Sequence, residues 1–177
     1  MFVKTHNFLM LAVACGACIA VSAADLPARK PGLWEITTTN TGNARVPPLV
    51  EKVCLDAATD QLLDKVGAGA SQKMCGRVDL TNVGGKVVID SECKIAGSTA
   101  TIHSTTTMSG DTASHMDNTV HYEPALFGKS GSTSTQDAKW LGSCPASMKP
   151  GDVETTPSPV MPVPMKMNLN DMFKGSQ

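Results

Sequence analysis

Four widely spaced cysteines set the strongest limit on the fold of this chain: Cys54, Cys75, Cys93 and Cys144. They remain from a total of six if an N-terminal export signal is removed. An even number of cysteines in an exported chain indicates two disulfides, and four cysteines allow three pairings. No spacing between them suits the close ligand pair of a zinc site. We expect Cys54–Cys75 to close a local loop and Cys93–Cys144 to tie a middle strand to the last one, both in a structural role.

Residues 1–23 have the pattern of a cleaved secretory signal. Lys4 supplies the positive charge, and an apolar stretch follows from Phe8 to Val21. That stretch is too short to cross a bilayer as a helix. The sequence therefore predicts export and no transmembrane segment.

Two cysteines inside this signal, Cys15 and Cys18, suggest two other interpretations. A lipoprotein-type cleavage would leave a very short apolar run, so lipid anchoring at Cys15 or Cys18 is disfavoured. Their C-x-x-C spacing also matches a redox motif, but the motif would be lost with the signal.

Alternating β-branched segments dominate the rest of the chain. "LWEITTT", from Leu33 to Thr39, is typical of a strand, and "GRVDLTNVGGKVVIDSEC" reads as two strands joined by a turn. One helix is expected near residues 56–66, capped by Asp56 and ended by Gly67. The glycine-rich "VGAGAS" follows this helix, whereas a phosphate-binding loop precedes one. The predicted fold is mainly β: a curved antiparallel sheet of about five to seven strands with one short helix.

The turn signal "MSGDT" predicts a hairpin in the middle of the sheet. We expect residues 109–111 to form its loop, with Met108 opposite Thr112 and His103 opposite Asp117. In this register the apolar side chains share one face and the polar ones share the other, as the strand period requires. The predicted apolar face consists of Ala100, Ile102, Met108, Met116, Val120 and Tyr122.

The two faces of this hairpin offer two candidate sites. On the polar face, His103 and His115 are expected to be diagonal neighbours and, with Asp117, to suit a divalent metal ion. Ordinary exposure of these histidines on a threonine-rich surface is the alternative. A cavity for a small apolar ligand would be lined on the other face by Ile102, Met116, Val120 and Tyr122.

The C-terminal tail, residues 151–177, is rich in proline and methionine. Its spacing of Met165, Leu169 and Met172 predicts one short docking turn. Packing over the domain or over a partner surface is the ordinary role for such methionines. The alternative is a site for Cu(I), which favours soft thioether ligands, at Met161, Met165 and Met167.

Other classes of function find little support in the sequence. A net charge of −1 and 4% aromatic residues argue against nucleic acid as a partner. Neither a G-x-S-x-G elbow nor an H-E-x-x-H pair is present, and no cofactor is expected. An unrecognised hydrolase remains a third hypothesis, because acids on different strands would be available to pair: Glu35, Asp90, Glu92 and Glu123.

Several segments together resemble a bacterial family called domain of unknown function 3617. They are "ARKPGLWEITTT", "VCLDAATDQLL" with "QKMC", and "KWLGSCPASMKPGD", and the resemblance extends over residues 28–152. It implies a disulfide-braced domain exported to the periplasm. It implies no activity and no catalytic residues.

Taken together, the sequence predicts a signal peptide, a β-rich domain over residues 24–150 and the tail. The expected function is non-catalytic binding, in the bacterial envelope, of a small apolar ligand or of a protein partner. Metal handling, through the tail or the histidine-bearing face, is the second hypothesis.

Overall fold

The computed structural model describes residues 27–43, 46–157 and 162–173. The signal peptide with Cys15 and Cys18, and also Met161, therefore lie outside the described residues. Among the described residues, no helix has both the length and the apolar character needed to cross a membrane.

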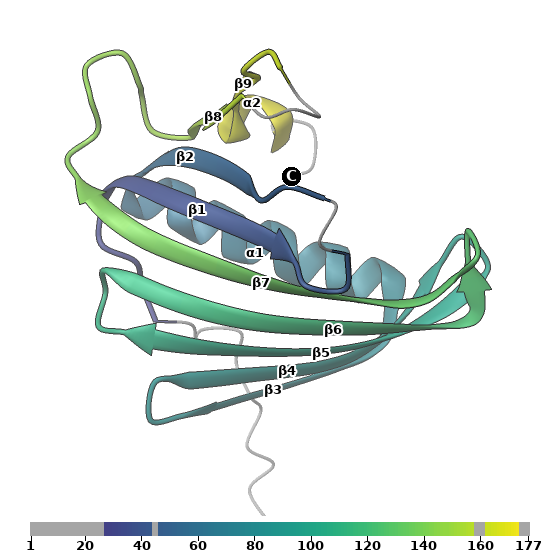
Figure 1. Cartoon of the computed structure of the whole chain (residues 1–177). Helices are drawn as coiled ribbons and strands as arrows, with labels where there is room; N and C mark the ends of the chain where they lie inside the picture. Colours follow the sequence, from purple (N-terminus) through teal and green to yellow (C-terminus); the bar gives the residue numbers. More distant parts are fainter. Residues whose placement is uncertain (1–26, 44–45, 158–161, 174–177) are drawn as a thin grey trace, which may run out of the picture.

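In the part of the chain that the structure describes, nine strands form one antiparallel sheet in the order β3-β4-β5-β6-β7-β1-β2-β8-β9 (Figure 1). The mainly β, antiparallel fold is thus confirmed, but the sheet has more strands than the five to seven predicted. The additional strands include β8 and β9, which are too short to show an alternating pattern. The strands are β1 (Gly32–Asn40), β2 (Leu49–Leu55), β3 (Cys75–Val83), β4 (Lys86–Ile95), β5 (Ser98–Ser109), β6 (Ala113–Leu126), β7 (Lys129–Gly142), β8 (Asp152–Thr155) and β9 (Lys166–Asn168).

The helix α1 (Ala57–Met74) is longer than predicted. Asp56 caps it as expected, because its carboxylate accepts a hydrogen bond from the backbone N–H of Thr59 at 2.7 Å. The prediction that Gly67 ends the helix is wrong. A glycine inside a helix lowers its stability by only about 1 kcal/mol. The helix therefore continues to Met74, and the N–H of Cys75 donates to the carbonyl of Ser71.

The disulfides are Cys54–Cys144 and Cys75–Cys93, so the predicted pairing is wrong. The 18 residues of α1 hold Cys54 and Cys75 about 27 Å apart. Strands β5 and β6 separate β4 from β7 by about 14 Å, which keeps Cys93 from Cys144. Cys75 and Cys93 are instead direct cross-strand neighbours.

The β5–β6 hairpin has its loop one residue later than predicted. Ser109 pairs with Ala113, and His103 lies opposite Thr119 rather than Asp117. Gly110 enters the turn with a φ of 63°, a left-handed conformation that glycine adopts without strain. Since both strands shift together, each side chain keeps its predicted face.

The core lies on the face of the sheet that α1 covers. Trp34, Val53, Leu55 and Val153 are buried there, and Leu63 of α1 packs against them. The C-terminal residues also contribute to it, through Met167 of β9 and Leu169 at the start of α2 (Leu169–Phe173). The short docking turn predicted for the tail corresponds to α2, although Met165 precedes it.

Candidate functional site

The four residues predicted to bind an apolar ligand share the face on which the helix lies. The strand register places them on one face. Across β5 and β6, Ile102 faces Val120, Ala100 faces Tyr122 and Thr106 faces Met116. Ile102, Met116, Val120 and Tyr122 are each half-buried, while their neighbours along the strands are mostly exposed. The alternation along β6 is regular from Ser114 to Glu123.

The helix α1 crosses this face (Figure 1). Its close backbone approaches to the sheet are to β2 at one end and to β3 and β4 at the other, and it also approaches α2. Burial follows the same division: Val53 and Leu55 are buried at the β2 side, and Val87 and Cys93 are buried on β4. Between these ends Ala100 is buried, but the larger apolar side chains of β5 and β6 stay partly open to solvent. We call the set Ile102, Met116, Val120 and Tyr122 the inner apolar patch.

Polar side chains border the inner apolar patch on the same face. Ser104 donates a hydrogen bond to Asn118 at 2.7 Å, and Gln136 donates to Thr38 at 3.3 Å. These groups are half-buried and bound to each other. The face therefore combines apolar surface with fixed hydroxyl and amide groups, the composition of many small-molecule sites.

Both histidines of the predicted metal site lie on the opposite, outer face. His115 lies opposite Thr107 and His103 lies opposite Thr119, so the two residues are about 13 Å apart along the strand direction. The prediction that they are diagonal neighbours is thus wrong, because the loop begins one residue later. Among the described residues, no group of three His, Cys, Asp or Glu side chains is arranged to hold a metal ion.

Each of these histidines instead has its own carboxylate. His103 Nδ1 lies 2.7 Å from Asp90, and His115 Nδ1 lies 2.6 Å from Asp137. Asp117 is 3.5 Å from the other ring nitrogen of His115. The hydrogen bond to Asp137 raises the pKa of His115 above its usual value, with a smaller contribution from Asp117.

Two of the tail methionines proposed for Cu(I) are described, and they differ in environment. Met167 packs against the core, opposite Val153. Met165 is 45% exposed, and its N–H donates to Thr155 at 2.8 Å. A packing role for Met167 is therefore directly visible.

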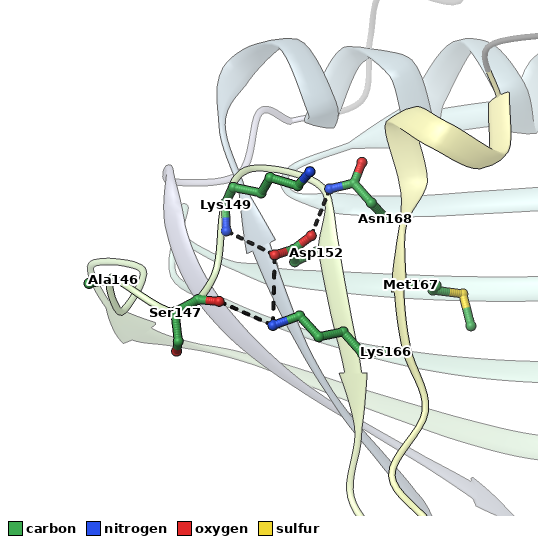
Figure 2. Close-up of a pocket in the computed structure, with 7 residues that line it drawn as sticks. All are labelled: Ala146, Ser147, Lys149, Asp152, Lys166, Met167 and Asn168. Carbon is green, nitrogen blue, oxygen red and sulfur yellow. Dashed lines mark hydrogen bonds and ion pairs between the residues drawn. The ribbon is translucent and has the colours of Figure 1, made fainter.

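A shallow pocket of about 500 Å³ lies where β8 and β9 meet the segment after β7 (Figure 2). The buried Asp152 organises it by accepting hydrogen bonds from Asn168 at 2.8 Å and from the backbone of Lys149 at 3.0 Å. The hydrogen bond from Asn168 is the main cause that holds the pKa of Asp152 below its usual value. The Lys166 ammonium lies 2.7 Å from the Glu154 carboxylate, and this contact raises the pKa of Lys166. The network attaches β9 to β8. The pocket is lined by Ala146, Ser147, Lys149, Asp152, Lys166, Met167 and Asn168.

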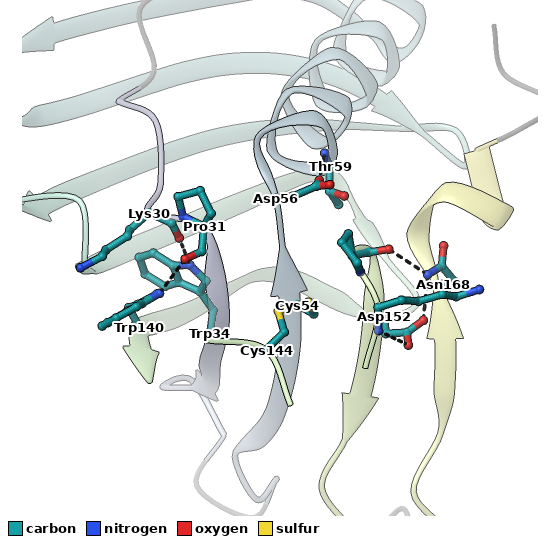
Figure 3. The surroundings of a disulfide bond; sticks show 12 residues. Lys30, Pro31, Trp34, Cys54, Asp56, Thr59, Trp140, Cys144, Asp152 and Asn168 are labelled. Atoms are coloured by element: carbon teal, nitrogen blue, oxygen red, sulfur yellow. Dashed lines mark hydrogen bonds between the residues drawn. A yellow bond between two sulfur atoms is a disulfide. The ribbon is translucent and has the colours of Figure 1, made fainter. Parts of the chain in front are cut away.

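The two most distinctive sequence segments meet each other beside the Cys54–Cys144 disulfide (Figure 3). Trp34 donates to the carbonyl of Lys30 at 2.8 Å, and Trp140 donates to that of Pro31 at 3.0 Å. The Lys30 ammonium lies 4.0 Å from the centre of the Trp140 ring. The sequence alone did not reveal this contact, although both tryptophans stand in quoted motifs.

The segment before β1 is also attached to the helix. Arg29 binds Asp60 through both its backbone N–H and its guanidinium, at 3.1 and 2.5 Å. Burial raises the pKa of the neighbouring Asp64, and the charge of Asp60 adds to this effect. These acids serve to hold the N-terminal segment against α1.

Comparison with known protein families gives a match over residues 29–144. The matching family is described as "Protein of unknown function (DUF3617)". No curated protein and no solved structure matches the chain.

Proposed function

This chain belongs to the DUF3617 family, whose description assigns no activity, and we propose that it is an exported, non-catalytic protein that binds a small apolar ligand in the bacterial envelope. The ligand lies on the inner apolar patch, between the sheet and α1. The bordering hydroxyl and amide groups contact its more polar end. Specificity would then come from a few fixed polar groups on a largely apolar surface.

One observation carries this proposal: the inner apolar patch is only half-buried although it lies on the core face of the sheet. Apolar side chains on a core face are normally removed from water by their neighbours. Here full burial is reached on either side of the patch, at Val53 and at Val87. A bound apolar molecule would complete the burial of Ile102 and Val120, which favours binding through the hydrophobic effect.

Export to the periplasm is supported by the covalent framework. Two disulfides join the four cysteines of the described chain, and such bonds persist in oxidising compartments. The signal-like pattern of residues 1–23 agrees with the same compartment.

A binding role, rather than catalysis, is supported by the partners of the shifted titratable groups. Asp56 caps α1, and its hydrogen bonds with Thr59 lower its pKa. Asp152 holds β8, Lys149 and β9 together. His115, the shifted histidine, lies exposed on the outer face, away from the inner apolar patch. The shifts of these three groups thus have structural causes outside the proposed site.

The experiment is titration with the fluorescent apolar probe 1-anilinonaphthalene-8-sulfonate, together with native mass spectrometry of protein purified from the periplasm. We expect saturable probe binding, and an added organic mass that the probe displaces. Met116→Gln and Val120→Thr should each weaken probe binding about tenfold. Both side chains are partly exposed and each replacement is similar in size, so the loss of stability should stay small enough for the domain to fold.

The matched control is Thr119→Val, which makes an apolar replacement next to Val120 on the outer face. It should leave probe binding unchanged. Equal binding by the wild-type protein, Met116→Gln and Val120→Thr would overturn the site. A bare protein mass, combined with no saturable probe binding, would overturn the function.

A further inference from the structure

The turn between β6 and β7 projects beyond both neighbouring strands. Pairing of β6 with β5 ends at Glu123, and pairing of β7 with β1 ends at Ser134. Beyond Glu123 on β6, the two strands have one further pair with each other, between Leu126 and Lys129. We call residues 124–129 the β6–β7 tip. In Figure 1 it lies at the far end of the longest strands.

Phe127 lies in the turn of this tip, where both its exposure to water and its backbone conformation are unfavourable for a phenylalanine. Its side chain is 90% exposed, and its backbone φ is 49°. Gly128 follows with a φ of 78°, so the turn is of the kind that favours Asn-Gly or Gly-Gly. A bulky residue at positive φ is strained, and an exposed ring gains no packing in return. The fold itself therefore gives no reason for phenylalanine at this position.

The inner apolar patch and the tip share one strand, β6. Met116, Val120 and Tyr122 lie on its inner face together with Asn118, and a register shift follows before the half-buried Leu126 and then Phe127. An apolar ligand on the patch thus lies on the strand that ends at the exposed ring. Lys129, also exposed, faces Leu126 across the turn and follows Phe127 by two residues. An aromatic ring next to a lysine matches the interfacial region of an anionic membrane.

We propose that the β6–β7 tip inserts Phe127 into the surface of a lipid bilayer, so that the inner apolar patch exchanges its ligand with the membrane. This inference rests on the proposed function, since the ligand must be apolar. The lysine contacts lipid phosphate while the ring enters the acyl boundary. One ring and one cation give weak, reversible binding, which suits a protein that leaves the membrane with its ligand.

The test is co-sedimentation of the full mature chain with vesicles of phosphatidylethanolamine and phosphatidylglycerol. The main variant is Phe127→Asn, because asparagine tolerates positive φ and should relieve strain. We expect it to unfold at a higher temperature than the wild-type protein, and to bind vesicles about tenfold more weakly.

The matched control is Ala96→Asn in the turn between β4 and β5. Ala96 has a φ of 48°, is followed by a glycine, and lies at the same end of the sheet. It should also raise the unfolding temperature but leave vesicle binding unchanged. If the wild-type protein does not bind vesicles, or if Phe127→Asn binds as well as the wild-type protein, the membrane role is overturned.

Probe titration without vesicles separates this inference from the proposed function. Phe127→Asn should bind 1-anilinonaphthalene-8-sulfonate as the wild-type protein does. Loss of both probe and vesicle binding in this variant would overturn the membrane role, because Phe127 would then act within the ligand site. Vesicle binding by a wild-type protein that binds no probe would overturn the proposed function and the exchange of ligand together.

Discussion

Trp34 and Trp140 face each other across β1 and β7, and their indole N–H groups donate to adjacent carbonyl oxygens, those of Lys30 and Pro31. The segment before β1 is thereby held across the end of β7. Trp34 is almost completely buried, at 1% exposure, and forms the centre of the core. The segments that identify the family thus contain residues that join the beginning of the domain to its last long strand.

Gly32 allows this approach, and replacing it with alanine should be strongly destabilising. A Cβ at this position would overlap the carbonyl of Gly142 and the indole nitrogen of Trp140, and the residue has a φ of 139°. We expect Gly32→Ala to lower the free energy of unfolding by about 2–4 kcal/mol, measured by urea denaturation. Gly76→Ala is the control, since nothing lies within 4 Å of its Cβ position. Similar losses in both variants would contradict the steric argument.

The two disulfides should differ in their contribution to stability. Cys54–Cys144 spans 90 residues and Cys75–Cys93 spans 18, so the first removes more chain entropy from the unfolded state. Replacing both cysteines by alanine should cost about 4.5 kcal/mol for the long loop and about 3 kcal/mol for the short one. Chemical denaturation of the two double variants measures the difference. Peptide mapping without reduction checks the pairing; a Cys54–Cys75 peptide would contradict it.

Met167 should contribute to folding, whereas Met165 should not. Met167 packs against the core and Met165 is 45% exposed. We expect Met167→Ala to lower the free energy of unfolding by about 1–2 kcal/mol, since its side chain is partly buried. Met165→Ala should change it by less than about 0.5 kcal/mol. Thermal unfolding of the two variants, one alanine substitution each, provides the comparison; equal effects would place β9 outside the folded unit.

The faces of the strands could be predicted from sequence because side-chain direction depends only on alternation. Ile102 and Val120 share a face in the predicted register and in the observed one, since the two registers differ by one residue in each strand. The residues that lie opposite each other, in contrast, change when the register shifts. His103 therefore lost its predicted partner, Asp117, and lies beside Asp90 of β4 instead.

The disulfide pairing and the last strands depend on sheet order, which local patterns do not contain. Cys144 reaches Cys54 because β1 brings β7 and β2 to its two sides.

Strands β8 and β9 are short, but charged residues alternate in sign along one row that crosses five strands. A row of this kind favours one register through opposite-charge neighbours. In order across the sheet, it consists of Lys139, Glu35, Lys52, Glu154 and Lys166.

The pKa of His115 should fall when Asp137 is replaced by asparagine. The hydrogen bond with Asp137 is the main cause that raises this pKa. A raised folded-state pKa stabilises the protein below the unfolded value, about 6.5, and this stabilisation is lost as the pH rises through the folded value. Titration of the histidine ring by NMR measures the change. Asp90→Asn, which removes the carboxylate beside His103, is the control and should leave the pKa of His115 unchanged. An unchanged pKa of His115 in Asp137→Asn would contradict the assigned cause.

The buried Asp152 should make the attachment of β9 sensitive to acid. Its pKa is lowered, so its stabilising effect is present above the unfolded value, about 3.9, and is lost as the pH falls through the folded value. Asp152→Asn should lower the unfolding midpoint at pH 7, because the charge that faces Asn168, Lys149 and Lys166 is removed. It should also flatten the loss of stability below about pH 4.

Unfolding midpoints measured across that pH range test this expectation. Asp111→Asn, at an exposed turn, is the control and should retain the acid dependence of the wild-type protein. If Asp152→Asn showed the same acid dependence as the wild-type protein, another carboxylate would have to be responsible, and Asp152 would serve only as a neutral hydrogen-bond acceptor between β8 and β9.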